Sequence, residues 1–297
     1  MSNKPKMVIL GAGESGLGSA VLALKKGYDV FVSDSGPIRE VYKDEFIRRG
    51  IPFEEGTHSV DRIMDAVEVI KSPGIPDKAP LVVKIKDSGI PVISEIEFAG
   101  RHTNAHKICI TGTNGKTTTT LLTYHVLQKA GLNVGLAGNV GKSFAMQVAE
   151  TEHDFYVLEL SSFQLDGMFE FKADTSVLLN ITPDHLDRYE YQLSKYVDSK
   201  FRIINNQNSK DAFIYCADDP ILNDAMKDRQ VIPACYPFSI AESEGMAAYL
   251  QNENLVINIK NQTLDMSIYN LALQGKHNLY NTMAAGIAAR ITVHAKN

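Results

Sequence analysis

Short apolar runs alternate with longer amphipathic stretches through residues 1–94. The apolar runs, which predict strands, are Met7–Leu10, Asp29–Val32, Ala66–Ile70 and Pro91–Ile93. The stretches with helical periodicity are Leu17–Lys26, Glu40–Arg49 and Pro80–Ser88. Because parallel strands need a crossover helix between them, this alternation predicts a parallel sheet with helices on both faces.

The alternation returns after a predicted connecting helix at Glu95–Arg101. Further strand patterns lie at Lys107–Ile110, Val134–Leu136, Phe155–Leu160, Ser176–Asn180, Ala212–Tyr215 and Val231–Ala234. Helical patterns lie at Thr117–Ala130, Ser143–Glu150, Tyr189–Asn206, Pro220–Met226 and Leu279–Ile291. The segments Leu255–Ile259 and Thr263–Ile268 alternate apolar and polar residues, which predicts a hairpin. We therefore predict an α/β fold in two domains, residues 1–94 and 95–297.

Composition agrees with two domains and narrows the partners. The chain has 297 residues, and a domain usually takes about 100–200. A net charge of −5 gives no reason to expect nucleic acid or an anionic membrane as partner. No apolar run of about 18 residues and no signal-peptide pattern occurs, so we expect a soluble, cytoplasmic chain. We also expect a monomer. The three cysteines are too scattered to suggest a disulfide framework or a metal cluster.

A glycine-rich turn follows the strand pattern Lys107–Ile110 and opens a helix. Its residues are Gly112, Thr113, Asn114, Gly115, Lys116, Thr117 and Thr118. A strand, a glycine turn, a Lys-Thr pair and a helix in this order predict a phosphate-binding loop. In such a loop the backbone N–H groups and the helix N-terminus face the phosphates, and the hydroxyl after the lysine binds Mg²⁺. Ile110 occupies the position of the first glycine in the usual G-x-x-x-x-G-K-[ST] spacing. The alternative is a Thr/Gly-rich turn with a structural role only.

A second glycine loop lies between the first predicted strand and helix. Gly11, Gly13 and Gly16 have the G-x-G-x-x-G spacing, and Asp34 ends the next strand. This arrangement is typical of a Rossmann-like unit that binds a dinucleotide, and it fits any nucleotide with a diphosphate equally well. An NAD-dependent oxidoreductase and a purely structural tight turn remain alternatives.

Polar side chains follow two strands of the second domain. Glu159 ends the apolar strand Phe155–Leu160, and His185 follows Ser176–Asn180. Ligands bind beyond the carboxyl ends of parallel strands, so Glu159 is a candidate Mg²⁺ ligand and His185 a candidate contact to a second cation, a phosphate or a carboxylate. A helix-capping Glu159 and a structural His185 are the alternatives.

Three further polar residues lie in predicted helices. Lys200, within Tyr189–Asn206, has the pattern of a surface lysine when judged from the residues alone. Asn278 and Asn281 share one face at the start of Leu279–Ile291, where Asn278 could instead cap the helix.

Taken together, these segments resemble the Mur ligases, the ATP-dependent amide ligases of peptidoglycan synthesis. The segments that carry the resemblance are 111–118, 138–141, 159–165, 180–188 and 275–281. Within the family they are most similar to the branch that adds D-glutamate to UDP-N-acetylmuramoyl-L-alanine. The phosphate loop alone is shared with folylpolyglutamate synthases, which keeps another amino-acid ligase of this type as an alternative.

The resemblance implies roles for individual residues. It implies that the first domain binds the UDP part of the substrate through Ser15, Gly16, Asp34, Ser35 and Gly74. It implies that Lys116 binds ATP phosphates, that Thr117 and Glu159 hold one Mg²⁺, and that His185 and a carbamylated Lys200 hold a second. It places Asn139, Ser161, Gln164 and His185 around the muramoyl-alanine and the metals, and Asn278 and Asn281 near the adenine nucleotide.

The resemblance also implies a reaction. ATP would activate the substrate carboxylate as an acyl phosphate, which the amine of D-glutamate then attacks. The family has a third, C-terminal domain that would follow the last residues of this chain. We therefore expect a two-domain fragment that binds its substrate but does not turn over by itself, and a nucleotide-sensing module without catalysis is the remaining alternative.

Overall fold

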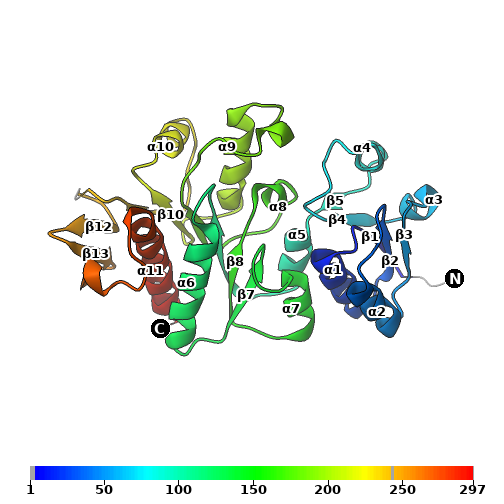
Figure 1. The fold of residues 1–297 in the computed structure, drawn as a ribbon, viewed down its shortest axis with the longest axis horizontal. Coiled ribbons are helices and arrows are strands. Elements are labelled where there is room, and N and C mark those ends of the chain that lie inside the picture. The colour runs from blue at the N-terminus through cyan, green and yellow to red at the C-terminus, as the bar shows by residue number, and fades with distance from the viewer. Residues whose placement is uncertain (1–3, 242–243, 297) are drawn as a thin grey trace. The chain divides into compact units, whose positions relative to one another are not determined.

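The computed structural model describes residues 4–241 and 244–296, and its chain forms two compact units (Figure 1). The first unit comprises Met1–Asn104, Gly141–Glu152 and Phe163–Phe171. The second unit comprises Ala105–Val140, His153–Ser162 and Lys172–Asn297. Among the described residues, no helix has both the length and the apolar character needed to cross a bilayer.

The first unit contains a five-stranded parallel sheet in the order β3-β2-β1-β4-β5. Its strands are β1 (Lys6–Leu10), β2 (Asp29–Asp34), β3 (Phe53–Glu55), β4 (Glu68–Lys71) and β5 (Val92–Ile93). Its helices are α1 (Glu14–Lys25), α2 (Glu40–Arg49), α3 (Val60–Ile63), α4 (Pro80–Asp87), α5 (Glu95–Gly100) and α7 (Phe144–Glu150). From β1 the chain adds β2 and β3 on one side, and β4 and β5 lie on the other side. Because crossovers between parallel strands are right-handed, this reversal places α1 and α4 on opposite faces of the sheet. The predicted parallel sheet is confirmed.

Alternate residues of β1 supply the two faces of this sheet. Val8 and Leu10 are buried in one core cluster with Val82 and Ile85 of α4. Since successive side chains of a strand point to opposite faces, Met7 and Ile9, which are also fully buried, serve the other face. A strand buried on both faces explains the uninterrupted apolar run in the sequence.

The second unit contains a nine-stranded sheet in the order β14-β13-β12-β11-β10-β9-β6-β8-β7. Its strands are β6 (His106–Thr111), β7 (Val134–Gly138), β8 (Phe155–Glu159), β9 (Thr175–Leu178), β10 (Ala212–Cys216), β11 (Ala234–Phe238), β12 (Ala248–Gln251), β13 (Asn254–Ile259) and β14 (Gln262–Ser267). Its long helices are α6 (Lys116–Lys129), α9 (Leu193–Phe201), α10 (Pro220–Lys227) and α11 (Lys276–Lys296). The strands from β7 to β12 run parallel, and β12, β13 and β14 pair antiparallel.

Two predictions for this unit are wrong in their boundaries. The strand expected at Val231–Ala234 is β11, which begins only at Ala234 and contains Pro237. Proline lacks an N–H and is rare in paired strands, so the sequence pattern did not indicate a strand at these residues. The single helix expected at Tyr189–Asn206 is interrupted because Glu190 and Tyr191 adopt positive φ angles of 54° and 58°. The short elements β3, α3, β12 and α8 (Ser162–Asp166) were not predicted.

The predicted hairpin is confirmed. β13 pairs with β14, and Ile259 lies opposite Gln262. The turn therefore has two residues, Lys260 and Asn261, with φ angles of 51° and 61°. Two positive φ angles are the geometry of a type I′ turn, which matches the twist of the flanking strands.

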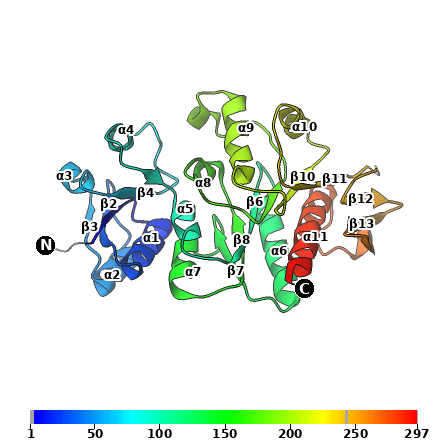
Figure 2. The ribbon, with the colours of Figure 1, turned by 180° about the vertical axis from the view of Figure 1, so that it is seen from behind.

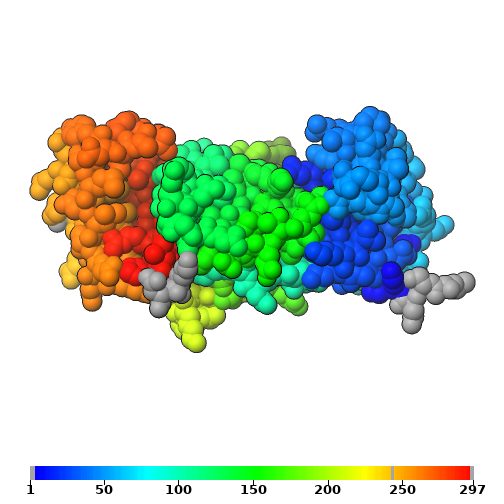
Figure 3. Space-filling model, turned by 90° about the horizontal axis from the view of Figure 1, so that it is seen from below, coloured from blue at the N-terminus to red at the C-terminus, as the bar shows by residue number. Residues whose placement is uncertain are grey.

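The parallel part of this sheet brings four loops to one edge. β7, β8, β6 and β9 are consecutive neighbours, so the segments after Gly138, Glu159, Thr111 and Leu178 follow one another along the carboxyl edge. Helices α6 and α11 lie side by side in both ribbon views (Figures 1 and 2). Figure 3 shows the surface of α11 (red) between the β12–β14 strands (orange) and α6 (green). The predicted phosphate loop leads from the end of β6, at this edge, to the start of α6.

Candidate functional site

The glycines of the loop after β6 have backbone conformations that other residues rarely adopt. Gly112 has φ +156° and Gly115, which caps α6, has φ +82°. A Cβ on Gly115 would lie 2.3 Å from Oδ1 of Asn281. The left-handed backbone and the close approach of Asn281 both require glycine here. This explains the Gly-Lys pair at the start of α6.

Lys116 is the first residue of α6, and its side chain folds over the loop. Its Nζ donates hydrogen bonds to the carbonyl oxygens of Gly112 at 3.1 Å and Thr113 at 2.8 Å. The first N–H groups of a helix have no intrahelical acceptor, so the amides at the start of α6 are available to an anion. Thr117, with an exposed side chain, follows directly. The arrangement fits the predicted phosphate site.

Glu159, at the end of β8, presents a buried carboxylate oxygen without a protein partner. Only 1% of the residue is exposed. Its Oε1 accepts a hydrogen bond from Nδ2 of Asn139 at 2.7 Å, while Oε2 has no hydrogen-bond partner among residues 4–241 and 244–296. A buried charge without a partner is costly, and a cation is the natural compensation. Glu159 and the neighbouring phosphate loop therefore fit a Mg²⁺ ion that also binds phosphate oxygens.

Lys200 is buried, and the surface position expected from the residues alone is wrong. Only 2% of the residue is exposed. Its Nζ donates to the carbonyl oxygen of Gly112 at 2.7 Å and lies 3.4 Å from Oγ1 of Thr111. Helix α9 therefore places the side chain of Lys200 in contact with the start of the phosphate loop. The helical periodicity alone did not reveal which face of α9 is covered.

Two residues that sequence reasoning left without a role also contact the loop. Asn180, just after β9, exchanges hydrogen bonds with Thr113 and Asn114. The hydroxyl of Tyr196 lies 3.2 Å from Oγ1 of Thr113. Burial raises the pKa of Tyr196, so its phenol stays protonated and can donate this bond. The sequence feature that could have indicated a role for Asn180 is its position at the end of a strand that neighbours β6, the strand before the phosphate loop.

His185 lies in the loop that follows β9. It has a positive φ of 49°, and its side chain is 58% exposed. Its Nε2 lies 3.6 Å from Oδ2 of Asp184. An exposed imidazole at the carboxyl edge is accessible to a ligand, and its role stays a prediction.

The two asparagines of α11 contribute differently. Asn281 is 7% exposed, and its Oδ1 accepts a hydrogen bond from Thr119 of α6 at 3.2 Å. Asn278 lies within α11, whose first residue is Lys276, so the expected capping position is wrong. Its Nδ2 donates to the carbonyl oxygen of Gln274, and its Oδ1 accepts from Asn281. Asn281 thus ties α11 to the helix that carries the phosphate loop.

In the first unit, the glycine loop after β1 is closed by Asp34. The backbone N–H of Ala12 donates to Oδ2 of Asp34 at 2.8 Å, and that of Gly36 donates to Oδ1 at 2.9 Å. A Cβ on Gly16 would lie 1.9 Å from the carbonyl oxygen of Gly11, so α1 approaches the strand end as the motif requires. Each carboxylate oxygen has a second acceptor position, which leaves Asp34 able to bind a ligand hydroxyl.

The remaining candidates lie in both units. In the first unit, Ser15 places its hydroxyl 3.5 Å from that of Ser72, Ser35 is exposed, and Gly74 has open space at its Cβ position. Gln164, in α8, is 5% exposed and belongs to the first unit by its contacts. Ser161 is half-buried and belongs to the second unit.

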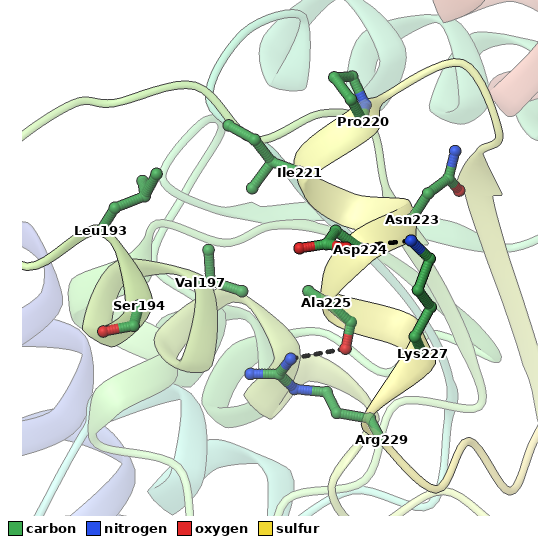
Figure 4. Close-up of a pocket in the computed structure, with 10 residues that line it drawn as sticks. All are labelled: Leu193, Ser194, Val197, Pro220, Ile221, Asn223, Asp224, Ala225, Lys227 and Arg229. Atoms are coloured by element: carbon green, nitrogen blue, oxygen red, sulfur yellow. Dashed lines mark hydrogen bonds and ion pairs between the residues drawn. The ribbon is translucent and has the colours of Figure 1, made fainter.

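A cavity of about 760 Å³ opens between α9 and α10 (Figure 4). Apolar side chains from both helices, including Val197 and Ile221, line it, and Arg229 donates to the carbonyl oxygen of Ala225 at its rim. None of the predicted site residues is among its lining residues. Tyr196 and Lys200 of α9 contact the phosphate loop, whereas Leu193 and Val197 of the same helix line the cavity.

Comparison with known proteins gives matches over nearly the whole chain. A family model described as the Mur ligase middle domain matches residues 110–289, and one described as the Mur ligase MurD-like N-terminal domain matches residues 5–94. UDP-N-acetylmuramoylalanine–D-glutamate ligase of Bacteroides fragilis is 55% identical over 286 residues. The enzyme of the same name from Porphyromonas gingivalis is 51% identical over 289 residues. The alignments cover 96% and 97% of this chain and 64% of each relative, so the chain spans about two thirds of their length at most.

Solved structures show the same fold at lower identity. The UDP-N-acetylmuramate:L-alanyl-gamma-D-glutamyl-meso-diaminopimelate ligase from Neisseria meningitides has a TM-score of 0.65 at 21% identity, with 97% of this chain and 93% of that chain covered. The UDP-N-acetylmuramate–alanine ligase of Thermotoga maritima has a TM-score of 0.56 at 22% identity, with 97% and 65% covered. At these identities the likeness concerns the fold alone.

Proposed function

The chain belongs to the Mur ligase family, and from this premise we propose that it is the substrate- and ATP-binding part of an ATP-dependent ligase that adds D-glutamate to UDP-N-acetylmuramoyl-L-alanine. The observation that carries the proposal is the loop at residues 112–116, which leads from β6 to Lys116 at the start of α6, next to the strand β8 whose last residue, Glu159, has a buried oxygen without a partner among the described residues. Relatives more than 50% identical carry the name of this activity.

ATP binds to residues 95–297 in this proposal. Lys116 and the first amides of α6 hold the phosphates, because both present positive charge at one point. Thr117 and Glu159 hold one Mg²⁺, and His185 belongs to a second. Asn278 and Asn281 lie near the adenine nucleotide. The buried, unpaired Oε2 of Glu159 supports the first metal site.

The UDP part of the substrate binds to residues 1–94. Its diphosphate faces the start of α1 at Ser15 and Gly16, since a helix N-terminus and a glycine turn suit an anion. Asp34, Ser35 and Gly74 contact the uridine. Asn139, Ser161 and Gln164 are assigned to the muramoyl-alanine end and the metals. A cytoplasmic location and a monomeric state remain predictions.

The reaction proceeds in two transfers. The terminal carboxylate of the substrate attacks the γ-phosphorus of ATP, ADP leaves, and an acyl phosphate forms. The amine of D-glutamate then attacks the acyl carbon, phosphate leaves, and the amine loses a proton. The first step joins two anions, and Mg²⁺, when bound, supplies positive charge against that repulsion. Lys116 contributes a fixed cation, and the loop amides orient the phosphates without reorganising.

A carbamylated Lys200 belongs to the second metal site in this proposal. Carbamylation joins the neutral amine to CO₂ with loss of a proton and converts a cation into an anion. Nζ of Lys200 now donates to the carbonyl oxygen of Gly112. A carbamate oxygen is an acceptor, so carbamylation requires the end of the Lys200 side chain to turn away from that carbonyl.

Calorimetric titration of the chain with ATP, with and without Mg²⁺, tests the nucleotide site. Lys116→Ala is expected to weaken ATP binding by at least about tenfold, since a charged hydrogen bond contributes about 1.5–3 kcal/mol. Lys129→Ala, at the other end of α6, is the matched control and should leave binding unchanged. Glu159→Gln should remove most of the gain that Mg²⁺ gives. Equal ATP affinity in Lys116→Ala and wild type, or no amide product with D-glutamate from a longer protein that carries this chain, would contradict the proposal.

A further inference from the structure

Asn180 makes four hydrogen bonds to the phosphate loop. Its Oδ1 accepts from the backbone N–H of Thr113 at 3.1 Å and from that of Asn114 at 2.8 Å. Its Nδ2 donates to the carbonyl oxygen of Asn114 at 3.0 Å. Its own carbonyl oxygen also accepts from the N–H of Thr113 at 3.0 Å. The side chain therefore pairs with the loop as another backbone segment would.

These bonds divide the amides of the loop into two groups. The N–H groups of Thr113 and Asn114 are used by Asn180 and do not face a ligand. The donors left for phosphate begin at Gly115 and continue into the first turn of α6. A phosphate loop works by holding such donors in place before the anion arrives. The residue that fixes Thr113 and Asn114 therefore also fixes where the remaining donors point.

Thr113 adds a second connection to the same segment. Its hydroxyl donates to the carbonyl oxygen of Thr182 at 3.1 Å and accepts from the N–H of Thr182 at 3.0 Å. Tyr196 approaches the same oxygen. One donor and two acceptor positions of the hydroxyl are thus all used. The loop is joined at two points to the segment that leads to His185.

We propose that Asn180 is a positioning residue for the triphosphate of a nucleotide. It holds Thr113 and Asn114 in the one conformation that presents the amides of Gly115 and the first turn of α6 to phosphate oxygens. Through the same bonds it couples the loop to the segment that carries His185. The inference rests on the proposed ATP site.

Amide hydrogen exchange of the ligand-free chain, followed by NMR, tests the ordering of the loop. In Asn180→Ala the amide of Asn114 should exchange about tenfold faster or more, because it loses its side-chain acceptor, whereas the amide of Thr113 keeps the backbone carbonyl oxygen of residue 180 and should change less. Asn180→Asp keeps an acceptor for both amides and should retain most of their protection. The matched control is Asn223→Ala, which removes another side-chain bond to a carbonyl in the same unit and should change neither amide.

Titration of the same variants with ATP and Mg²⁺ tests the link to the nucleotide. Asn180→Ala should weaken ATP binding by about tenfold and Asn223→Ala by less than about twofold. A variant that exchanges as wild type does, or one that exchanges faster but binds ATP equally well, overturns the inference. If Asn180→Ala does not fold, Asn180→Asp becomes the test variant. Its loop amides should stay protected, and its added negative charge should lower the affinity for ATP. A wild-type chain that binds no ATP overturns the proposed function and the nucleotide role of Asn180 together, whereas unchanged exchange overturns the ordering role alone.

Discussion

Two ammonium groups converge on the carbonyl oxygen of Gly112. Nζ of Lys116 lies 3.1 Å from it and Nζ of Lys200 lies 2.7 Å from it. Two cations on one acceptor repel each other, and Lys200 is almost entirely removed from water. Loss of the charge on either lysine relieves this repulsion. Carbamylation of Lys200 would remove one of the two charges, and a phosphate bound by Lys116 would offset the other.

The proposed carbamylation of Lys200 can be tested directly. In the chain incubated with ¹³C-bicarbonate, NMR should show one carbamate carbon that disappears in Lys200→Arg, because a guanidinium does not form the adduct. The signal should grow with rising pH, since only the neutral amine reacts with CO₂. Lys210→Arg, at an exposed lysine, is the control and should keep the signal. A carbamate signal that survives in Lys200→Arg would assign the modification elsewhere.

Among the elements, α5 and α7 of the first unit are joined by one buried carboxyl group. Glu95, at the start of α5, accepts hydrogen bonds from the hydroxyl of Ser143 and the N–H of Ala145, both at 2.7 Å. Burial raises the pKa of Glu95 in spite of these bonds, and the nearby charge of Glu14 acts in the same direction. The folded state therefore holds the proton of Glu95 more tightly than the unfolded chain does.

This pKa shift gives a pH dependence of known sign. The contribution of Glu95 to stability is fully present below its unfolded pKa near 4.5 and is lost as pH rises through its folded pKa. Glu95→Gln is neutral at every pH, so its stability relative to wild type should improve between pH 4.5 and pH 8. Thermal unfolding midpoints measured across this range test the difference.

Glu45→Gln is the matched control for that experiment. Hydrogen bonds from Arg48 and Arg49 lower the pKa of Glu45 to about 2, so Glu45 is already charged throughout the range. The difference between Glu45→Gln and wild type should therefore stay constant from about pH 6 to pH 8, where Glu45 is charged in the folded and the unfolded state alike. A difference for Glu95→Gln that is equally constant would show that the Glu95 proton does not distinguish the folded from the unfolded state.

Elements with a strong local pattern could be predicted from the sequence, and elements defined by their neighbours could not. α2 was predicted with its observed ends because Gly50 terminates it with a left-handed φ of 65°. β11 was misplaced because pairing with β10, rather than its own composition, makes Ala234–Phe238 a strand. The break at Glu190 and Tyr191 was missed, since neither residue type favours a positive φ.

For the whole molecule, each of the two units carries its own glycine loop at the start of a helix. The first lies before α1 and the second before α6. Local sequence predicted both loops, because glycine spacing and strand-to-helix order are local properties. The burial of Lys200 and the bonds of Asn180 depend on residues more than sixty positions away, and only the folded chain shows them.

The ligand preference of the glycine loop in the first unit distinguishes a site for a UDP-linked substrate from a site for NAD. UDP-N-acetylmuramoyl-L-alanine should raise the thermal unfolding midpoint of the chain, and NAD should not. A ligand at about 100 times its Kd stabilises the folded state by about 2.7 kcal/mol, which is a shift of a few degrees for a chain of this size. Lys116→Ala, in the other loop, should leave this shift intact. Stabilisation by NAD alone would favour an oxidoreductase.

The contact between Gly115 and Asn281 has a consequence for the order in which the site forms during synthesis. The phosphate loop leaves the ribosome early in the second unit, but Asn281, which lies against Gly115 and accepts the hydrogen bond of Thr119, is made more than 160 residues later. Contacts of such sequence separation form late because closing a long loop has an entropic cost. A nascent chain therefore exposes the predicted phosphate loop long before α11 packs beside α6 and completes the surroundings of that loop.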